Sequence, residues 1–200
     1  MTEVEVGTAA IASAGVDRVG IILGLEPAWP GAYVSGRAFT VRGSRGDNLA
    51  IHQAVARAGE GEIVVVDVEG EEEIAHCGDI LVLAALQRGI RGIILDGSIR
   101  DRRAIAELRF PIFHRGTSPR RPTKAVPGQL GIPVRLRGTT VNPGDYVCAD
   151  DDGVVVVPAG EAESILAAAA AVEEDERSIE HRILAGETTI EIFELAEGAA

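Results

Sequence analysis

The chain has 200 residues, a length typical of one domain with a sizeable core, so we expect a single domain over residues 1–200. Hydrophobic residues make up 46% of the chain and charged residues 25%, which is typical of a soluble globular protein and excludes a collagen-like, low-complexity or broadly disordered one. A net charge of -12 and an aromatic content of 4% argue against nucleic-acid binding, which relies on basic side chains and on aromatic rings that stack on bases.

Short runs of β-branched residues alternate with helical segments in the first part of the chain. Strands are predicted at residues 32–41, 62–67, 92–95 and 111–114, and helices at residues 49–58, 79–88 and 101–108. The run EIVVVD at 62–67 is typical of a strand covered on both faces. Asp47 or Asn48 is expected to cap the helix that follows it. The alternation predicts a βαβ arrangement.

Turn residues separate runs of β-formers from residue 132 onwards. The sequences NPGD at 142–145 and DDDG at 150–153 predict antiparallel hairpins. A long helix is predicted at about Ala162–Leu184, and Gly186 ends it. The expected fold is α/β, with a mixed sheet layered with helices, a hairpin-rich second half and a long C-terminal helix.

The apolar stripe of the long helix contains one acidic residue. Helical spacing places Glu176 in the series Ile165, Ala169, Val172, Glu176, Ile179 and Ile183. A carboxylate on a buried face is costly unless it is paired, hydrogen-bonded or close to a metal. Alternatively, the end of the helix protrudes and Glu176 is solvated within the acidic run at 173–176. The pattern alone favours this second interpretation.

The segment Leu95–Asp101 joins an apolar strand to a helix. Open α/β sheets bind ligands just beyond the carboxyl ends of their strands, so polar groups here are well placed for a site. Arg100 can bind a carboxylate with two hydrogen bonds, and Asp101 offers hard oxygen atoms to Mg²⁺ or Mn²⁺. The alternative is ordinary helix capping by Ser98 or Asp101, with Arg100 in a surface ion pair.

The segment His76–Leu81 is a glycine turn that leads into another helix. The backbone N–H groups of Ile80 and Leu81, at the start of that helix, can bind an anionic carboxylate. Asp79 is otherwise an ordinary N-cap. A zinc site at His76 and Cys77 is rejected, because no second pair of Cys or His residues follows at ligand spacing.

Charge is distributed unevenly along the chain. Residues 151–200 carry 13 acidic side chains and 2 basic ones, whereas residues 100–137 carry nine arginines and Lys124 against two acidic residues. The basic stretch predicts a loop that binds small carboxylates, or ion pairs between subunits. A Schiff-base role for Lys124, the only lysine, is conceivable, but nothing places it in an apolar pocket.

Two further features bear on location. Cys77 and Cys148 lie far apart in the sequence and cannot form the dense disulfide framework of a small secreted domain. Met1–Glu5 shows no basic region followed by an apolar one, and no stretch approaches the roughly 20 apolar residues of a membrane span. We therefore expect a cytoplasmic protein with no membrane partner.

Several of these motifs together resemble one known family. Asp79 followed after twenty residues by Arg100-Asp101, with GDN at 46–48 and the turn motifs at 141–145 and 150–158, resembles the RraA-like and 4-hydroxy-4-methyl-2-oxoglutarate (HMG) aldolase family. The resemblance covers roughly residues 30–190 and implies an RraA-like α/β/α swivelling-domain architecture. It also implies a class II pyruvate aldolase, a lyase that cleaves HMG or a related 4-hydroxy-2-oxo acid, with oxaloacetate decarboxylase activity.

The resemblance implies roles for individual residues around a 2-oxo acid substrate. Asp101 would bind Mg²⁺ or Mn²⁺, and Arg100 would bind pyruvate and its enolate oxygen. Asp79 would hold a water on the metal. The turn at Gly78 and the N–H groups of Ile80 and Leu81 would bind the pyruvate carboxylate.

Two further matches involve charged residues elsewhere in the chain. Lys124 falls where the family places a basic substrate-binding side chain. Glu176 falls at a catalytic carboxylate supplied by the neighbouring subunit of a homotrimer or homohexamer, which would explain an acid on the apolar stripe.

Two alternatives remain open at this stage. The first alternative to an aldolase is a non-catalytic RraA-like regulator that binds ribonuclease E. The second is a module that binds a small metabolite without turnover. The presence of Asp79, Arg100 and Asp101 favours the aldolase.

Overall fold

The computed structural model describes residues 5–196, so Met1–Val4, which belong to the opening segment considered above, lie outside the described residues. Within the described part, nine strands form one mixed sheet in the order β1-β11-β10-β3-β4-β5-β6-β2, with β7 paired to β3. The strands are β1 (Gly20–Ile22), β2 (Glu26–Pro27), β3 (Val34–Arg42), β4 (Ile63–Cys77), β5 (Gly92–Ile99), β6 (Ile112–Thr117), β7 (Gln129–Leu130), β10 (Tyr146–Asp150) and β11 (Gly153–Val157). A separate hairpin consists of β8 (Val134–Leu136) and β9 (Thr139–Val141).

The centre of the sheet is parallel, and its edges are antiparallel. β3, β4, β5 and β6 run parallel to one another, whereas β10, β11 and β1 continue the sheet with antiparallel pairing. The helices are α1 (Thr8–Ala14), α2 (Leu49–Arg57), α3 (Asp79–Gln87), α4 (Arg102–Glu107), α5 (Ala162–Leu184) and α6 (Thr189–Ile192). Since α2, α3 and α4 each connect two neighbouring parallel strands, the predicted βαβ arrangement is confirmed.

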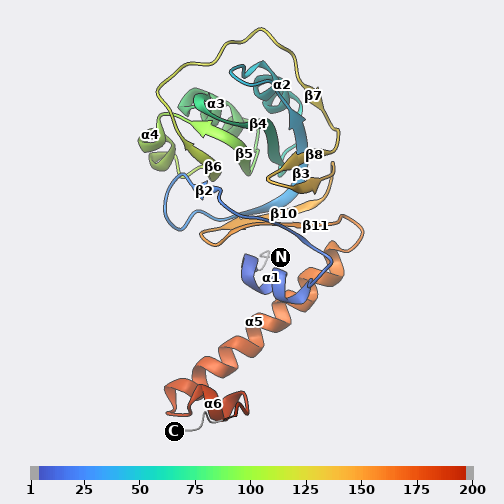
Figure 1. The fold of residues 1–200 in the computed structure, drawn as a ribbon, viewed down its shortest axis with the longest axis vertical. Helices are drawn as coiled ribbons and strands as arrows, with labels where there is room; N and C mark the ends of the chain where they lie inside the picture. Colours follow the sequence, from blue (N-terminus) through green and yellow to red (C-terminus); the bar gives the residue numbers. More distant parts are fainter. Residues whose placement is uncertain (1–4, 197–200) are drawn as a thin grey trace.

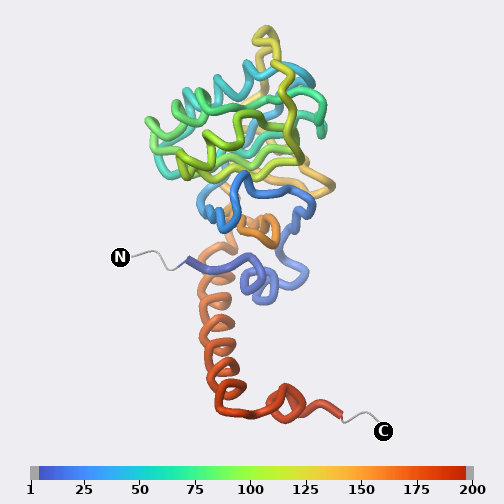
Figure 2. The backbone as a smooth tube through the Cα atoms, turned by 90° about the vertical axis from the view of Figure 1, so that its left-hand side faces the viewer, coloured from blue at the N-terminus to red at the C-terminus, as the bar shows by residue number. Residues whose placement is uncertain are grey.

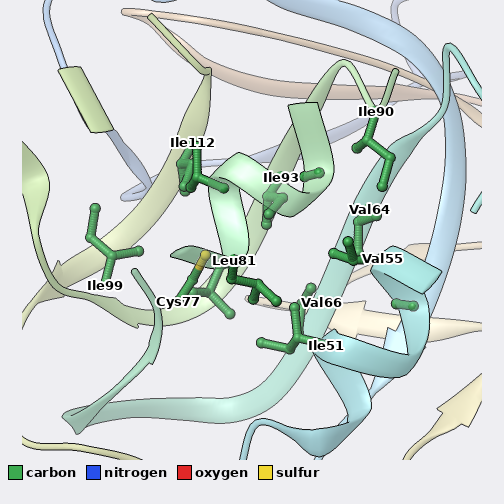
Figure 3. Close-up of a cluster of buried hydrophobic side chains, with 14 of the residues drawn as sticks. Ile51, Val55, Val64, Val66, Cys77, Leu81, Ile90, Ile93, Ile99 and Ile112 are labelled. Carbon is green, nitrogen blue, oxygen red and sulfur yellow. The ribbon is translucent and has the colours of Figure 1, made fainter. Parts of the chain in front are cut away.

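One hydrophobic core lies between the parallel strands and helices α2 to α4. Figure 3 shows Ile51 and Val55 of α2 and Leu81 of α3 directed towards Val64 and Val66 of β4. The intervening residues of β4, at 63 and 65, belong to a second core on the opposite face of the sheet. β4 is therefore covered on both faces, as its continuous apolar run predicts. Each fully buried Val, Leu or Ile side chain contributes about 1.5–3 kcal/mol to folding.

A third core joins α1 and α5 to the β10–β11 hairpin. Ile165 and Ala169 of α5 are buried there, against Val155 and Val157 of β11. Figures 1 and 2 show that the rest of α5 projects away from the sheet and carries α6 at its tip. The predicted bounds of α5 are confirmed, and Gly186 lies just beyond its end with a positive φ of 101°.

Some elements extend beyond their predicted bounds or were not predicted. β4 continues to Cys77 through several bulges, and β5 continues to Ile99, so the two strands stay paired up to the start of the following loops. The elements α1, β1, β2, β7 and α6 are all short and were not predicted, although the capping box of Thr188 and Glu191 marks the start of α6. None of the helices between residues 5 and 196 combines the length and the apolar composition needed to traverse a bilayer.

Candidate active site

The candidate site lies at the edge where the parallel strands end. Gly46-Asp47-Asn48 precede α2, Gly78 joins β4 to α3, and Arg100-Asp101 join β5 to α4. The carboxyl ends of parallel strands share one edge of a sheet, so these three connections lie side by side. A hydrogen bond of 2.9 Å from the Arg100 amide to the Cys77 carbonyl joins the ends of β4 and β5.

A pocket of about 170 Å³ opens between these connections. Its lining includes six of the residues predicted for the site, namely Gly78, Asp79, Ile80, Leu81, Arg100 and Lys124. It also includes polar residues that were not predicted for it, namely Asn48, His52, His76 and Arg121. Residues from the three connections and from the segment 121–124 therefore converge on one pocket that can accept an anion of small-molecule size.

Arg100, which lines the pocket, forms an ion pair with its neighbour Asp101, which does not line it. The distance from Arg100 Nε to Asp101 Oδ2 is 3.1 Å, and the two side chains are 32% and 39% exposed. Asp101 opens onto an adjacent depression of about 390 Å³, which Thr117 and Ser118 also line. Both charged groups are thus accessible to a ligand at the border between the two hollows.

The backbone at Asp101 excludes simple helix capping as the role of its side chain. Asp101 has a left-handed conformation with φ 56° and ψ 32°, and its carboxylate makes no capping hydrogen bond to α4. A residue other than glycine is strained in this region, although aspartate tolerates it better than most. Ser98 does not cap α4 either, because its hydroxyl donates to the Glu72 carbonyl at 2.8 Å.

Asp79 is the first residue of α3, and the N-cap is Gly78. Asp79 Oδ1 accepts the N–H of Ile80 at 2.8 Å, and the N–H of Leu81 donates to the Gly78 carbonyl at 3.1 Å. Both amides predicted to bind a substrate carboxylate therefore have acceptors within the chain in this structure. Their binding to a carboxylate stays a prediction, and it requires these contacts to be shared or replaced.

A buried carboxylate holds the loop that carries Lys124. Asp47 is 2% exposed, and its Oδ2 accepts hydrogen bonds of 2.6 Å from the Thr123 hydroxyl and from the Ala125 N–H. Burial raises the pKa of Asp47, but hydrogen bonds from Thr123, Ala125 and Leu49 outweigh it and lower the pKa to about 2. The sequence predicted Asp47 only as a helix cap and did not predict that Asp47 would hold the loop at residues 123–125.

Burial shifts the pKa values of the histidines beside the pocket, of Cys77, which also lines it, and of Cys148, which lies in the third core. Burial lowers the pKa of His76, whose Nε2 accepts the N–H of Gly46 at 3.2 Å. Burial raises the pKa of Cys77 to about 12, and that of Cys148 likewise, so both thiols stay protonated and poorly nucleophilic. His52 lines the pocket, and burial together with the charge of Lys124 lowers its pKa.

Glu176 lies apart from this pocket within one chain. It is exposed on the projecting part of α5, and it lines neither of the two hollows beside Arg100. Within a single chain the solvated interpretation of Glu176 therefore applies. A catalytic role for this residue needs a second copy of the chain.

The residues present fit a hydrated divalent cation better than zinc. Among residues 5–196, no group of three or more His, Cys, Asp and Glu side chains is arranged to hold a metal. Asp101 offers an accessible carboxylate, and Mg²⁺ characteristically binds one or two carboxylates while keeping several waters. A zinc site, which takes three or four protein ligands that are most often Cys and His, does not fit this donor set.

Comparisons with known proteins agree with the fold and identify the family. The family described as "RraA-like: Aldolase/RraA" matches residues 8–156. A protein of Halalkalibacterium halodurans named "Putative 4-hydroxy-4-methyl-2-oxoglutarate aldolase" is 38% identical over 150 residues, which cover 75% of this chain and 71% of that protein.

Solved structures show the same architecture. An uncharacterized protein from Pseudomonas syringae pv. tomato superposes with a TM-score of 0.83 at 30% identity, covering 92% of this chain and 90% of the other. RraAS2 from Streptomyces coelicolor, described as an unusual member of the RNase ES inhibitor RraA protein family, gives 0.72 at 30% identity, covering 88% and 91%. With its mixed α/β fold and a matching segment of this length, the chain belongs to the RraA-like, Aldolase/RraA family.

Proposed function

We propose that this protein is a divalent-cation-dependent carbon–carbon lyase. It would release pyruvate from HMG or a related 4-hydroxy-2-oxo acid, and it would also decarboxylate oxaloacetate. The observation that carries the proposal is the Arg100–Asp101 pair, with 3.1 Å between Nε and Oδ2, in which Arg100 lines the same pocket as Asp79 and Asp101 lines the adjacent depression. The relative from Halalkalibacterium halodurans, at 38% identity, supports the same reaction class.

Asp101 is the residue that would hold the cation, as Mg²⁺ or Mn²⁺. Its carboxylate is 39% exposed and forms no capping bond, so it is accessible for this role. When bound, such a cation polarises the keto group of a 2-oxo acid and stabilises the negative charge of an enolate. Asp101 also holds the Arg100 guanidinium in place through their ion pair.

Arg100 stabilises the charge that develops during bond cleavage. Its guanidinium donates charge-assisted hydrogen bonds to the substrate oxygen that becomes the enolate. When the C3–C4 bond of a 4-hydroxy-2-oxo acid breaks, the deprotonated C4 oxygen forms the carbonyl group of the second product, and the bonding electrons pass to the pyruvate enolate. Loss of CO₂ from oxaloacetate leaves the same enolate. One arginine therefore serves both reactions, and protonation of the enolate releases pyruvate.

Asp79 and Lys124 complete the pocket. Asp79 orients the water molecule that removes the proton from the C4 hydroxyl of the substrate. Lys124, which also lines the pocket, binds an anionic group of the substrate. Gly78 leaves room for the Arg100 and Asp101 side chains, because a Cβ atom at residue 78 would lie too close to both.

A second copy of the chain would bring Glu176 to this site in a homotrimer or homohexamer. The projecting part of α5 supports this proposal, because Ile183 is 43% exposed and Leu184 is 84% exposed there. Large exposed apolar side chains on one element are typical of an interface. The acidic end of the chain and the basic stretch at 100–137 have complementary charges.

An assay of pyruvate release tests the proposed function. The purified protein is given Mg²⁺ or Mn²⁺ with oxaloacetate or HMG, and EDTA is then added. We expect release that EDTA abolishes, and that is lost in Arg100→Ala and Asp101→Ala but kept in Arg103→Ala, a control at an arginine whose side chain is 94% exposed. No EDTA-sensitive release from either substrate would favour the alternative, a non-catalytic regulator that binds ribonuclease E, in line with the RNase ES inhibitor family to which RraAS2 of Streptomyces coelicolor is assigned.

A further inference from the structure

Two segments far apart in the sequence are joined beside the pocket. Thr123 N–H donates to the Gly46 carbonyl at 2.8 Å, and Asn48 N–H donates to the Thr123 carbonyl at 3.0 Å. The Asp47 carboxylate lies between the residues that make these two backbone bonds. It accepts hydrogen bonds from the Thr123 hydroxyl and the Ala125 N–H, on either side of Lys124. Lys124 is therefore enclosed by a set of hydrogen bonds that converge on one buried carboxylate.

Both oxygens of Asp47 are needed as acceptors. Oδ2 accepts from Thr123 Oγ1 and Ala125 N at 2.6 Å each, and Oδ1 accepts from Leu49 N at 2.9 Å. An asparagine at this position has one acceptor oxygen and one NH₂ group. Whichever way the amide is turned, its NH₂ group faces a backbone N–H, and two donors then meet without an acceptor. At a 2% exposed position, water cannot fully relieve that conflict.

The Lys124 side chain faces the pocket from this loop. It lines the pocket together with His52 of α2, and its charge contributes to the low pKa of that imidazole. Lys124 itself is exposed, so its own packing does not fix its position. A flexible lysine loses binding energy if it must be ordered when the ligand arrives, whereas a loop held in advance avoids this cost.

We propose that Asp47 is a positioning residue that holds the segment 123–125 so that the Lys124 ammonium lies over the pocket. The consequence for substrate binding rests on the proposed function above, whereas the placement of Lys124 by Asp47 does not. Asp47 touches no substrate in this proposal, and it acts only through the loop.

Kinetics and NMR test the proposal together in Asp47→Asn. If Lys124 binds the substrate equally in the ground state and the transition state, its displacement raises KM by about tenfold and changes kcat by less than about threefold. Lys124→Met should give the same pattern, and the double variant should be no worse than Lys124→Met alone. The pKa of His52, followed by NMR in the absence of substrate, should rise in both variants as the lysine charge is removed or displaced.

Two further variants keep the outcome decisive. Asp145 is another buried carboxylate, 5% exposed, which holds the Asn142 turn through the Asn142 N–H at 2.8 Å, so Asp145→Asn is a matched control. Thr123→Val removes the hydrogen bond from the Thr123 hydroxyl to Asp47 and replaces Asp47→Asn in the test if that variant does not fold. We expect the His52 pKa and KM to change in the same direction as in Asp47→Asn, but by less.

The results separate the two levels of the proposal. An unchanged His52 pKa in Asp47→Asn, or the same change in Asp145→Asn, would overturn the positioning role. If the unaltered protein releases no pyruvate, the proposed function fails while the NMR result still decides whether Asp47 positions Lys124. A shift of His52 in Asp47→Asn with additive kinetic effects in the double variant would overturn the link to substrate binding.

Discussion

Gly78 lies so close to the Asp101 carboxylate that a Cβ at residue 78 would come within 2.6 Å of Asp101 Oδ2. The same Cβ would lie 3.1 Å from the Cγ and Nε atoms of Arg100. The backbone of Gly78 is extended, with φ -146° and ψ -177°, a conformation that alanine adopts without strain. The need for glycine at this position therefore comes from the ion pair that packs against it.

Gly78→Ala should displace the ion pair and leave the fold intact. The nearest groups are ends of flexible side chains, so we expect little change in Tm but a fall of about tenfold or more in kcat/KM for pyruvate release, because small displacements of catalytic groups are costly. Gly160→Ala is the control, as a Cβ there would meet no atom within 4 Å. Equal kcat/KM values in the two variants would contradict this account of the site.

Arg100→Lys tests whether geometry matters in addition to charge. Lysine keeps the positive charge but cannot form the forked hydrogen bonds of a guanidinium, so we expect kcat/KM to fall by about 100-fold. Arg103→Lys should have no effect, because Arg103 is exposed and paired with Glu107 on the surface of α4. Steady-state kinetics of oxaloacetate decarboxylation measures both variants. Near-normal turnover by Arg100→Lys would show that charge alone is sufficient.

Mixing two inactive variants tests whether Glu176 acts across a subunit boundary. Arg100→Ala and Glu176→Gln should each lose most activity when alone. After co-refolding in equal amounts, about a quarter of the shared sites should contain both intact residues, which restores measurable turnover. Glu174→Gln, a change at a carboxylate paired with Arg177 on the same helix, is the control and should stay active. A mixture as inactive as its components would argue against a shared site.

His114 should make stability depend on pH. The imidazole is 1% exposed, and burial, followed by the charge of Arg102, lowers its pKa from 6.5 to about 4. As pH falls from about 6.5 towards 4, the unfolded chain binds a proton that the folded chain does not, so folding loses stability. Between pH 7 and pH 5, this group should lower the free energy of unfolding by about 2 kcal/mol.

Urea unfolding at the two pH values measures this effect. His114→Leu should lose less stability between pH 7 and pH 5 than the unaltered protein does. A control is His181→Leu, because His181 is exposed on α5, and it should keep the full dependence. A pH dependence that is unchanged in His114→Leu would show that other groups cause it.

The elements that could be predicted from the sequence are those whose signals are local. The bounds of α5 follow from its apolar spacing and from Gly186, and the parallel strands follow from continuous apolar runs bounded by turns. The extension of β4 could not be predicted, because residues 71–73 are three consecutive glutamates. In the fold the backbone of this segment pairs with β5, and arginines from other segments pair with two of the glutamates, as Arg45 does with Glu71 at 3.0 Å and Arg120 with Glu73 at 2.9 Å.

The same distinction holds for the site. Arg100 could be singled out because it follows an apolar strand, where the sheet places its ligand-binding edge, and Asp79 because a glycine turn leads into a helix there. The second role of Asp47 could not, since its partner Thr123 lies 76 residues further along the chain. The position of Glu176 relative to a substrate depends on a second chain, and the sequence of one chain supports only a hypothesis about it.

Exchange of the pyruvate methyl protons in D₂O tests the central claim most directly, because it reports the enolate without the physiological substrate. With Mg²⁺ or Mn²⁺ present, the account predicts that the protein replaces these protons with deuterium, followed by NMR. It predicts that EDTA stops the exchange and that Arg100→Ala and Asp101→Ala lose it, whereas Arg103→Ala keeps it. Exchange no faster than in buffer, or exchange that persists in Arg100→Ala, would contradict an enolate-stabilising site at Arg100 and Asp101.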